Sequence, residues 1–212
     1  MEQSAKKTGK TYEMDMCSGA LFPKIVAFAV PLILSGILQL LFNAADIIVV
    51  GHFAGRESLA AVGSTTALIN LMINVFVGLS IGANVLVAQY SGAKKLKDLE
   101  ETVHTAMMIA LAGGFLLIFV GVFFSGPMLG LMGTPDDVLP LAALYLKIYF
   151  IGMPATLTYN FGAAILRAVG DTRRPLYFLL FAGAVNVVLN LVFVIVFSMG
   201  VAGVATATVV SE

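Results

Sequence analysis

The chain has 212 residues, of which 59% are hydrophobic and only 11% are charged, and its mean hydropathy is +0.99. This balance excludes a water-soluble globular domain, and a formal net charge of zero argues against the basic surface that nucleic-acid binding requires. The length accommodates about six membrane-spanning helices of about 20 apolar residues each, in a single bundle.

The N-terminal segment is polar, and we predict that residues 1–22 form a cytoplasmic tail and that residues 23–212 form the membrane bundle. The single cysteine, Cys17, lies in the tail, so the sequence holds neither a disulfide framework nor a thiolate metal cluster. The first apolar run exceeds the roughly 7–15 residues of a cleavable signal core. We therefore interpret it as the first helix.

Five apolar stretches are long enough to span the hydrocarbon, at residues 24–50, 61–90, 103–125, 139–166 and 176–199. A sixth begins near Val201 and reaches Glu212 after only about three turns. The sequence is therefore expected to be a fragment whose sixth helix is incomplete. The spacing of Gly78 and Gly82 predicts a close helix contact in the second stretch.

Basic residues lie in alternate connections. On one predicted side are Lys6, Lys7, Lys10, Lys24, Lys94, Lys95, Lys97, Arg167, Arg173 and Arg174. The opposite side has only Arg56, together with Asp136 and Asp137. Because short cytoplasmic connections are enriched in Lys and Arg, we predict a multi-pass protein of the cell membrane with a cytoplasmic N-terminus.

One acidic residue lies in the middle of an apolar stretch. A charged side chain there costs about 2.5–3.5 kcal/mol on insertion scales, so Asp46 is a functional hypothesis by default. Helical spacing places Gln39, Phe42, Asn43 and Asp46 on one face, which is expected to turn away from lipid.

Other stretches carry polar stripes at helical spacing. Their members are Asn70, Asn74 and Asn84; Tyr145, Tyr149, Thr156 and Asn160; Asn186 and Asn190; and Thr206 and Thr208. Such stripes favour a hydrated cavity, because unsatisfied polar groups in hydrocarbon are costly. The alternative is that these side chains form helix–helix hydrogen bonds worth about 0.6 kcal/mol each.

The polar residues suggest ion coupling. Removal from water disfavours the charged form of a carboxyl group, so Asp46 is a candidate proton carrier. If Asn186, Asn190 and Thr208 add oxygens beside it, the same pocket would suit Na+, and the residues alone do not choose between the ions. The membrane-embedded cation Lys147 is predicted to extend toward the interface rather than to pair with Asp46.

Several enzyme and cofactor classes lack their signatures. The sequence contains no phosphate-binding G-x-x-x-x-G-K-[ST] loop, no H-E-x-x-H and no paired cysteines. His52 and His104 are expected near opposite membrane faces, and no Ser-His-Asp site is supported. We therefore predict a protein that is not an enzyme, has no cofactor, and draws energy from an ion gradient.

Segments distributed along the chain resemble those of the MATE (multidrug and toxic compound extrusion) family. They are Pro-Leu-Ile-Leu-Ser at 31–35, Asn-Ala-Ala-Asp at 43–46, Val-Gly at 50–51, Leu-Ala-Ala-Val-Gly at 59–63, Gln-Tyr-Ser-Gly-Ala-Lys at 89–94 and Arg-Ala-Val-Gly-Asp-Thr-Arg-Arg-Pro at 167–175. Each is weak alone, but their order along the chain is specific.

The resemblance implies an all-α fold of twelve helices in two lobes, of which this chain would be the N-lobe, truncated within helix 6. It also implies alternating-access antiport, in which H+ or Na+ entry drives export of drugs or amphipathic cations. The family's N-lobe cation site would correspond to Asp46, Asn186, Asn190 and Thr208, with Tyr145 and Asn160 nearby. Some relatives carry Asp where this chain has Asn190, which favours proton coupling through Asp46.

Substrate contacts are predicted at Gln39, Phe42, Asn70 and Asn74, with helix packing as the alternative role. The expected partners are small-molecule drugs, the lipid bilayer and a missing C-terminal lobe.

The alternative functions are a flippase for lipid-linked oligosaccharides, from the same superfamily, and a non-transporting membrane protein. A flippase would need a strongly basic cavity, which the sequence lacks. The connection 167–175 is predicted to be structural, to cap the helix of the 139–166 stretch and to hold the topology through its basic residues.

Overall fold

The computed structural model describes residues 21–212, and that range contains helices and no strand. The elements are α1 (Leu21–Val49), η1 (Val50–Ala54), α2 (Gly55–Gly92), α3 (Leu96–Leu131), α4 (Leu139–Ile151), α5 (Met153–Ala168), α6 (Arg173–Leu191), η2 (Val192–Val196) and α7 (Gly200–Ser211). The predicted all-α class is confirmed. Residues 1–20 of the predicted tail, with Cys17, lie outside the described residues.

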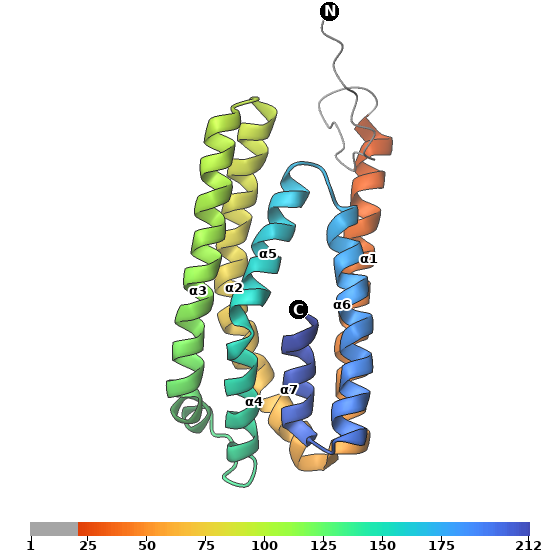
Figure 1. The fold of residues 1–212 in the computed structure, drawn as a ribbon, viewed down its shortest axis with the longest axis vertical. Helices are drawn as coiled ribbons and strands as arrows, with labels where there is room; N and C mark the ends of the chain where they lie inside the picture. Colours follow the sequence, from red (N-terminus) through yellow and green to blue (C-terminus); the bar gives the residue numbers. More distant parts are fainter. Residues whose placement is uncertain (1–20) are drawn as a thin grey trace, which may run out of the picture.

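The first helical stretch makes two passes. Phe22–Gly92 is one of three helical stretches long and apolar enough to cross a membrane, but 71 straight residues would measure about 105 Å. Figure 1 shows that the chain reverses direction at η1, between α1 and α2. The reversal ends at Gly55, whose φ of 87° is a conformation that glycine adopts readily.

The stretch predicted as one helix over 139–166 is broken in two. The bend between α4 and α5 is 52°, and the pair counts as one further candidate span. The break falls at Gly152, and Pro154 occupies the first turn of α5, where its missing N–H group leaves no bond unmade. Pro154 thus starts a helix and does not interrupt one, and the predicted single span is a bent pair of helices.

The helices also extend past their apolar runs. The run at 103–125 belongs to a helix that covers Leu96–Leu131, and the run at 61–90 to one that covers Gly55–Gly92. The added turns carry charged residues such as Asp98 and Glu101. Hydropathy therefore predicts the part of a helix that lies in lipid, and not where its hydrogen bonds end.

The bundle has two sides joined by a middle layer. Figure 1 shows α1 beside α6, α2 beside α3, and α4, α5 and α7 between the two pairs. Large buried side chains come from the middle layer, among them Leu146, Phe150, Met153, Leu157 and Phe161. Many large apolar side chains point outward, as a lipid-facing surface requires.

Glycines make the closest helix contacts, but at other positions than predicted. Gly78 and Gly82 face open space within the described chain, so the predicted contact there is not formed. On α3, in contrast, Gly114 lies against the backbone of Pro154 and Gly121 lies against Phe150. The spacing identifies small residues, but which of them meet another helix depends on the rotation of each helix in the bundle.

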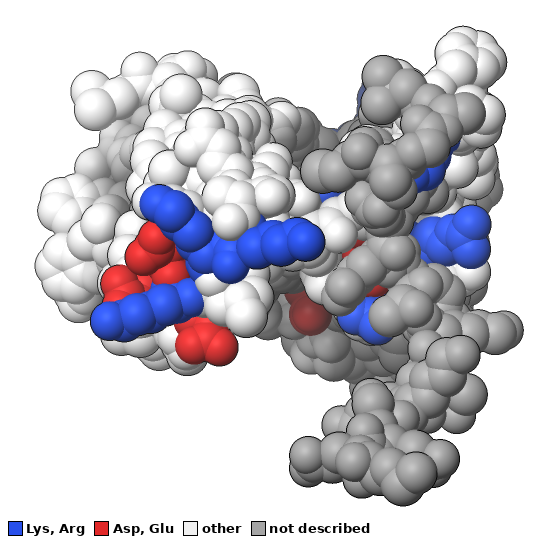
Figure 2. Space-filling view, turned by 90° about the horizontal axis from the view of Figure 1, so that it is seen from above, with Lys and Arg blue, Asp and Glu red and all other residues white. Residues whose placement is uncertain are grey.

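One end of the bundle carries the predicted basic connections. Viewed from above the top of Figure 1, Lys and Arg side chains gather over both sides of this end, with acidic side chains between them on the side of α2 and α3 (Figure 2). The residues of the α2–α3 and α5–α6 connections supply them, including Lys94, Lys95, Arg173 and Arg174. The predicted grouping of these charges at one end is confirmed for the described residues.

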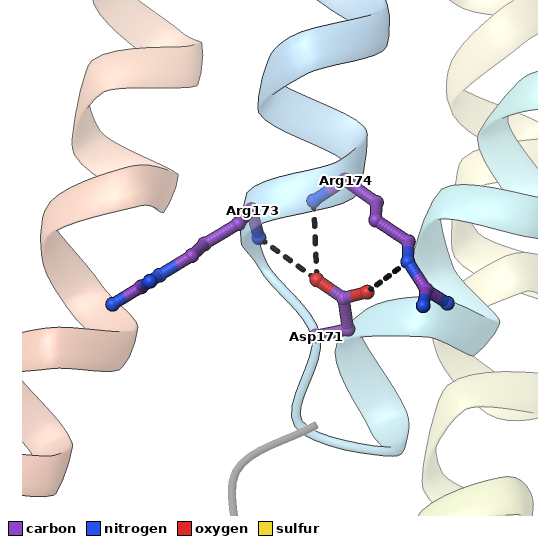
Figure 3. Close-up of polar contacts among 3 residues, drawn as sticks. All are labelled: Asp171, Arg173 and Arg174. Carbon is purple, nitrogen blue, oxygen red and sulfur yellow. Dashed lines mark hydrogen bonds and ion pairs between the residues drawn. The ribbon is translucent and has the colours of Figure 1, made fainter. Parts of the chain in front are cut away.

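The α5–α6 connection caps the preceding helix, as predicted, and also the start of α6, which was not predicted. Gly170, with φ of 90°, ends α5 in a left-handed turn in which the Asp171 N–H donates to Leu166 O at 2.9 Å. The fully buried Asp171 then accepts hydrogen bonds from the N–H groups of Arg173 and Arg174, at 3.1 Å each, and pairs with Arg174 Nε at 3.1 Å (Figure 3).

Candidate functional site

A chain of side-chain hydrogen bonds links three helices inside the bundle. The amide Nδ2 of Asn190 donates to Asp46 Oδ1 at 2.5 Å and to Asn186 Oδ1 at 3.0 Å. The amide of Asn186 in turn donates to Thr208 Oγ1 at 3.4 Å. Four of the six residues predicted for the cation site are therefore in direct contact, and we call them the Asp46 network.

The helices place these groups through their periodicity and packing. Asn186 and Asn190 lie one turn apart on α6, so their amides follow the same face. The ring of Phe42 on α1 fits against Gly183 on α6, where a Cβ atom would collide with it. This contact brings α1 close enough to α6 for Asp46, one turn beyond Phe42, to meet Asn190.

The network is enclosed on the α6 side. Asn190 is fully buried and Asn186 nearly so, whereas Asp46 is half-buried. The Oδ1 atom of Asn190 is buried and has no hydrogen-bond partner among the described residues. A buried, unpartnered acceptor beside a carboxylate is an arrangement that a proton donor or a small cation would complete.

Two tyrosines border the network. Tyr145 is buried and stacks on Tyr149, with ring centroids 6.0 Å apart and planes inclined by 28°. Tyr145 lies within electrostatic reach of the Asp46 carboxylate. The predicted neighbourhood of Tyr145 and Asp46 agrees with this placement, although no hydrogen bond between them is formed.

Asn160 does not join the network. Its amide donates to the Thr156 carbonyl on its own helix, at 3.0 Å. The hydroxyl of Thr156 instead donates to the Glu212 carboxylate, a pair that sequence reasoning missed. The available signal was spacing, because Glu212 lies one turn beyond Thr208 on the same predicted helix.

The four predicted substrate contacts lie on two helices, Gln39 and Phe42 on α1 and Asn70 and Asn74 on α2. Gln39, Asn70 and Asn74 are exposed, and the Asn74 amide donates to the Asn70 carbonyl at 2.7 Å. Phe42 packs between α1 and α6. Another asparagine of the same stripe, Asn84, donates to the Ala164 carbonyl at 2.5 Å and so bonds α2 to α5.

Within residues 21–212, no group of three or more His, Cys, Asp or Glu side chains lies close enough together to hold a metal ion. Lys147 is exposed and forms no ion pair with Asp46. The Asp46 network therefore offers one carboxylate and the oxygens of amides and a hydroxyl, which suit a proton or an alkali cation.

Comparisons with known proteins agree on one family. The MatE family profile matches residues 31–192. The chain is 32% identical over 200 residues to the probable multidrug resistance protein YpnP of Bacillus subtilis (strain 168), covering 93% of this chain and 44% of YpnP. It is 34% identical over 188 residues to the probable multidrug resistance protein YoeA of the same organism, covering 87% and 41%.

Solved structures give the same result. The fold is similar to a crystal structure of MATE in the bent conformation, with a TM-score of 0.84, 27% identity, and 91% of this chain and 43% of that chain covered. It also resembles the outward-facing conformation of a multidrug resistance MATE family transporter of the MOP superfamily, with a TM-score of 0.83 and 28% identity. This chain spans less than half the length of these relatives. The family match contains Asp46, Asn186 and Asn190.

Proposed function

Because this chain belongs to the MatE family of multidrug transporters, we propose that it forms the N-terminal lobe of a secondary active exporter of drugs or amphipathic organic cations. Export would be driven by antiport with H+ or Na+ through alternating access of two lobes. The missing C-terminal lobe is part of this proposal, since the relatives are more than twice as long as the match. The lobe has no enzymatic role in this scheme.

The Asp46 network is the observation that carries the proposal. Asp46 holds a carboxylate within an apolar helix, and its partner Asn190 is fully buried. A group that only stabilises helix packing would gain about 0.6 kcal/mol from such a bond, against an insertion cost of about 2.5–3.5 kcal/mol for the charged form. That imbalance favours a functional role for Asp46 in coupling.

A proton is the coupling ion that we favour. The network contains a single carboxylate, with two amides and one hydroxyl, and so carries one unit of negative charge. Protonation removes that charge and converts the carboxyl group from an acceptor into a donor, which lets Asp46 exchange partners as the lobe changes conformation. Na+ would instead gather oxygens of Asp46, Asn186, Asn190 and Thr208.

The basic end gives the orientation that we propose. The α2–α3 connection, which carries Lys94 and Lys95, and the arginine-rich α5–α6 connection lie at the end where α1 begins (Figure 1), and Lys97 follows in the first turn of α3. Under the positive-inside rule this end faces the cytoplasm of the cell, and the N-terminus lies there with it. Gln39, Phe42, Asn70 and Asn74 stay as proposed substrate contacts, to be presented to the second lobe.

Transport in proteoliposomes tests the proposal. The full-length protein that the gene encodes is reconstituted, and efflux of a fluorescent organic cation is followed under separately imposed pH and Na+ gradients. Asp46→Asn is expected to abolish the response to one gradient, because the variant cannot take up or release a proton. The matched control is Asp137→Asn, which makes the same change in an exposed connection.

The outcomes separate the alternatives. Loss of pH-driven efflux in the Asp46 variant alone supports proton coupling at this site. Loss of Na+-driven efflux assigns the site to Na+. Transport equal to that of the parent protein under both gradients would show that Asp46 is structural and that coupling belongs elsewhere.

A further inference from the structure

A groove separate from the Asp46 network lies between α2, α3 and α5. It has a volume of about 370 Å³, within the range of small-molecule sites. Apolar side chains of Leu79, Leu86, Ile109 and Phe161 line its deep part. Tyr90, Asp98 and Glu101 line the other part, near the basic end of the bundle.

The groove changes from polar to apolar along the helix axis. Asp98 and Ile109 are eleven residues apart on α3, which corresponds to about 16 Å. Asp98 lies in the first turn of α3, beside the connection to α2. The polar part of the groove therefore lies where lipid headgroups lie, and the apolar part extends into the depth of the acyl chains.

The carboxylates of Asp98 and Glu101 line the polar part of the groove, and each has a lysine beside it that is not itself a lining residue. Lys95 Nζ lies 3.9 Å from Asp98 Oδ2, and Lys97 Nζ lies 4.0 Å from Glu101 Oε1. All four side chains are largely exposed, and such surface pairs contribute about 0–1 kcal/mol. A ligand that carries both charges can replace these pairs at small cost.

Two threonine hydroxyls at the mouth already donate to backbone carbonyls, whereas the Tyr90 hydroxyl is a further neutral polar group there. The hydroxyl of Thr102 donates to the Asp98 carbonyl and that of Thr105 to the Glu101 carbonyl, at 2.7 Å each. The charged groups that a ligand would meet are the two carboxylates, which line the groove, and the two ammonium groups beside them. Figure 2 shows acidic and basic side chains interleaved at this end.

We propose that this groove binds a phospholipid whose headgroup carries a primary amine, taken from the leaflet at the basic end of the bundle. The ammonium group would donate to Asp98 and Glu101, the phosphate would accept from Lys95 and Lys97, and an acyl chain would cover Leu79, Leu86 and Ile109. This assignment does not depend on the proposed transport activity.

Charge and hydrogen-bonding capacity distinguish this lipid from others. An anionic headgroup without an amine would meet the two carboxylates unpaired, which is repulsive. A quaternary ammonium has no N–H group to donate, so a choline headgroup keeps the charge and loses the hydrogen bonds. A simple organic cation would leave Lys95 and Lys97 without the acidic partners that it displaces.

Native mass spectrometry of the full-length protein tests the assignment. Protein is released from micelles that contain phosphatidylethanolamine, phosphatidylcholine or phosphatidylglycerol with identical acyl chains, and the bound fraction of each lipid is measured. We expect at least fivefold greater retention of phosphatidylethanolamine than of phosphatidylcholine. The double variant Asp98→Asn/Glu101→Gln should abolish this preference.

The matched control is Glu100→Gln. It removes one negative charge, against two in the double variant, from the same segment of α3. Glu100 does not line the groove, so the preference should be unchanged. Each variant is first shown to be monodisperse by size-exclusion chromatography. Thr105→Val is a second variant within the groove, and it should keep the preference for phosphatidylethanolamine. Equal retention of the ethanolamine and choline lipids would overturn the proposal, as would a preference that survives the double variant. Preferential retention of phosphatidylglycerol, or displacement by an organic cation without any lipid preference, would also overturn it.

Discussion

Replacement of Asn190 by leucine tests the Asp46 network most directly. Leucine has a similar size, but it removes the amide that donates to Asp46 Oδ1 at 2.5 Å and to Asn186 Oδ1 at 3.0 Å. A hydrogen bond to a charged group contributes about 1.5–3 kcal/mol and a neutral one about 0.5–1.5 kcal/mol. With Asp46 ionised, the expected loss of stability is therefore about 2–4.5 kcal/mol.

The same loss should depend on pH. When Asp46 is protonated, both bonds are neutral, and neutral bonds in membranes contribute about 0.6 kcal/mol each, or about 1.2 kcal/mol together. The destabilisation caused by Asn190→Leu should thus be larger at pH 8 than at pH 5, because only the ionised carboxylate makes a charge-assisted bond.

Thermal unfolding of the purified full-length protein measures both effects. The fraction that stays monodisperse after heating is compared for the parent, Asn190→Leu and the control Asn74→Leu at the two pH values. Asn74 is exposed and its amide contacts only the Asn70 carbonyl among the described residues, so its replacement should have little effect at either pH. Equal destabilisation by the two variants would refute the reasoning, and so would a loss at Asn190 that does not change with pH.

Three further variants test the architecture by the same thermal assay. Gly114→Ala should destabilise the protein by about 1–3 kcal/mol, because its Cβ atom would lie 2.8 Å from Pro154 N. Its control, Gly78→Ala, lies in open space and should be close to neutral. Equal effects of the two variants would argue against the α3–α5 contact. Asp171→Ala should cost about 1–2 kcal/mol, because it removes the carboxylate oxygen that accepts from two N–H groups at the start of α6. Asp137→Ala should have no such cost, and a neutral Asp171 variant would show that the cap is dispensable. Lys94→Gly should stabilise the protein by up to about 1 kcal/mol, because Lys94 follows the end of α2 with φ of 55°, a conformation that favours glycine. Lys94→Ala should show no such gain. A gain in both variants would assign the effect to the lost charge.

The sequence predicted the helices that cross the bundle and the end that carries the basic residues, because both depend on composition over about 20 residues. It did not predict the break at Gly152 or the extra turns of α3. A proline in the first turn of a helix and one inside a helix look alike in a hydropathy pattern. Helix ends depend on capping bonds, such as those of Asp171, which hydropathy does not register.

The site was predicted in part for a similar reason. Asn186 and Asn190 follow from one-turn spacing, and the family resemblance joined them to Asp46 and Thr208. Asn160 has the same residue type and a comparable setting, yet its amide bonds to its own helix. The rotation of each helix about its axis decides between these outcomes, and it is set by contacts such as Phe42 against Gly183.

The pairing of α1 with α6 has a consequence for how the protein is made. The two helices pack together, but 123 residues, 50–172, lie between the end of α1 at Val49 and the start of α6 at Arg173. At about 5–20 residues per second, a ribosome needs about 6–25 s to synthesise this interval. During that time Asp46 has no Asn190 to contact, so the insertion machinery or the lipid must tolerate an unpaired acid in α1. Until α6 is made, α1 also lacks the helix that it packs against in the finished fold.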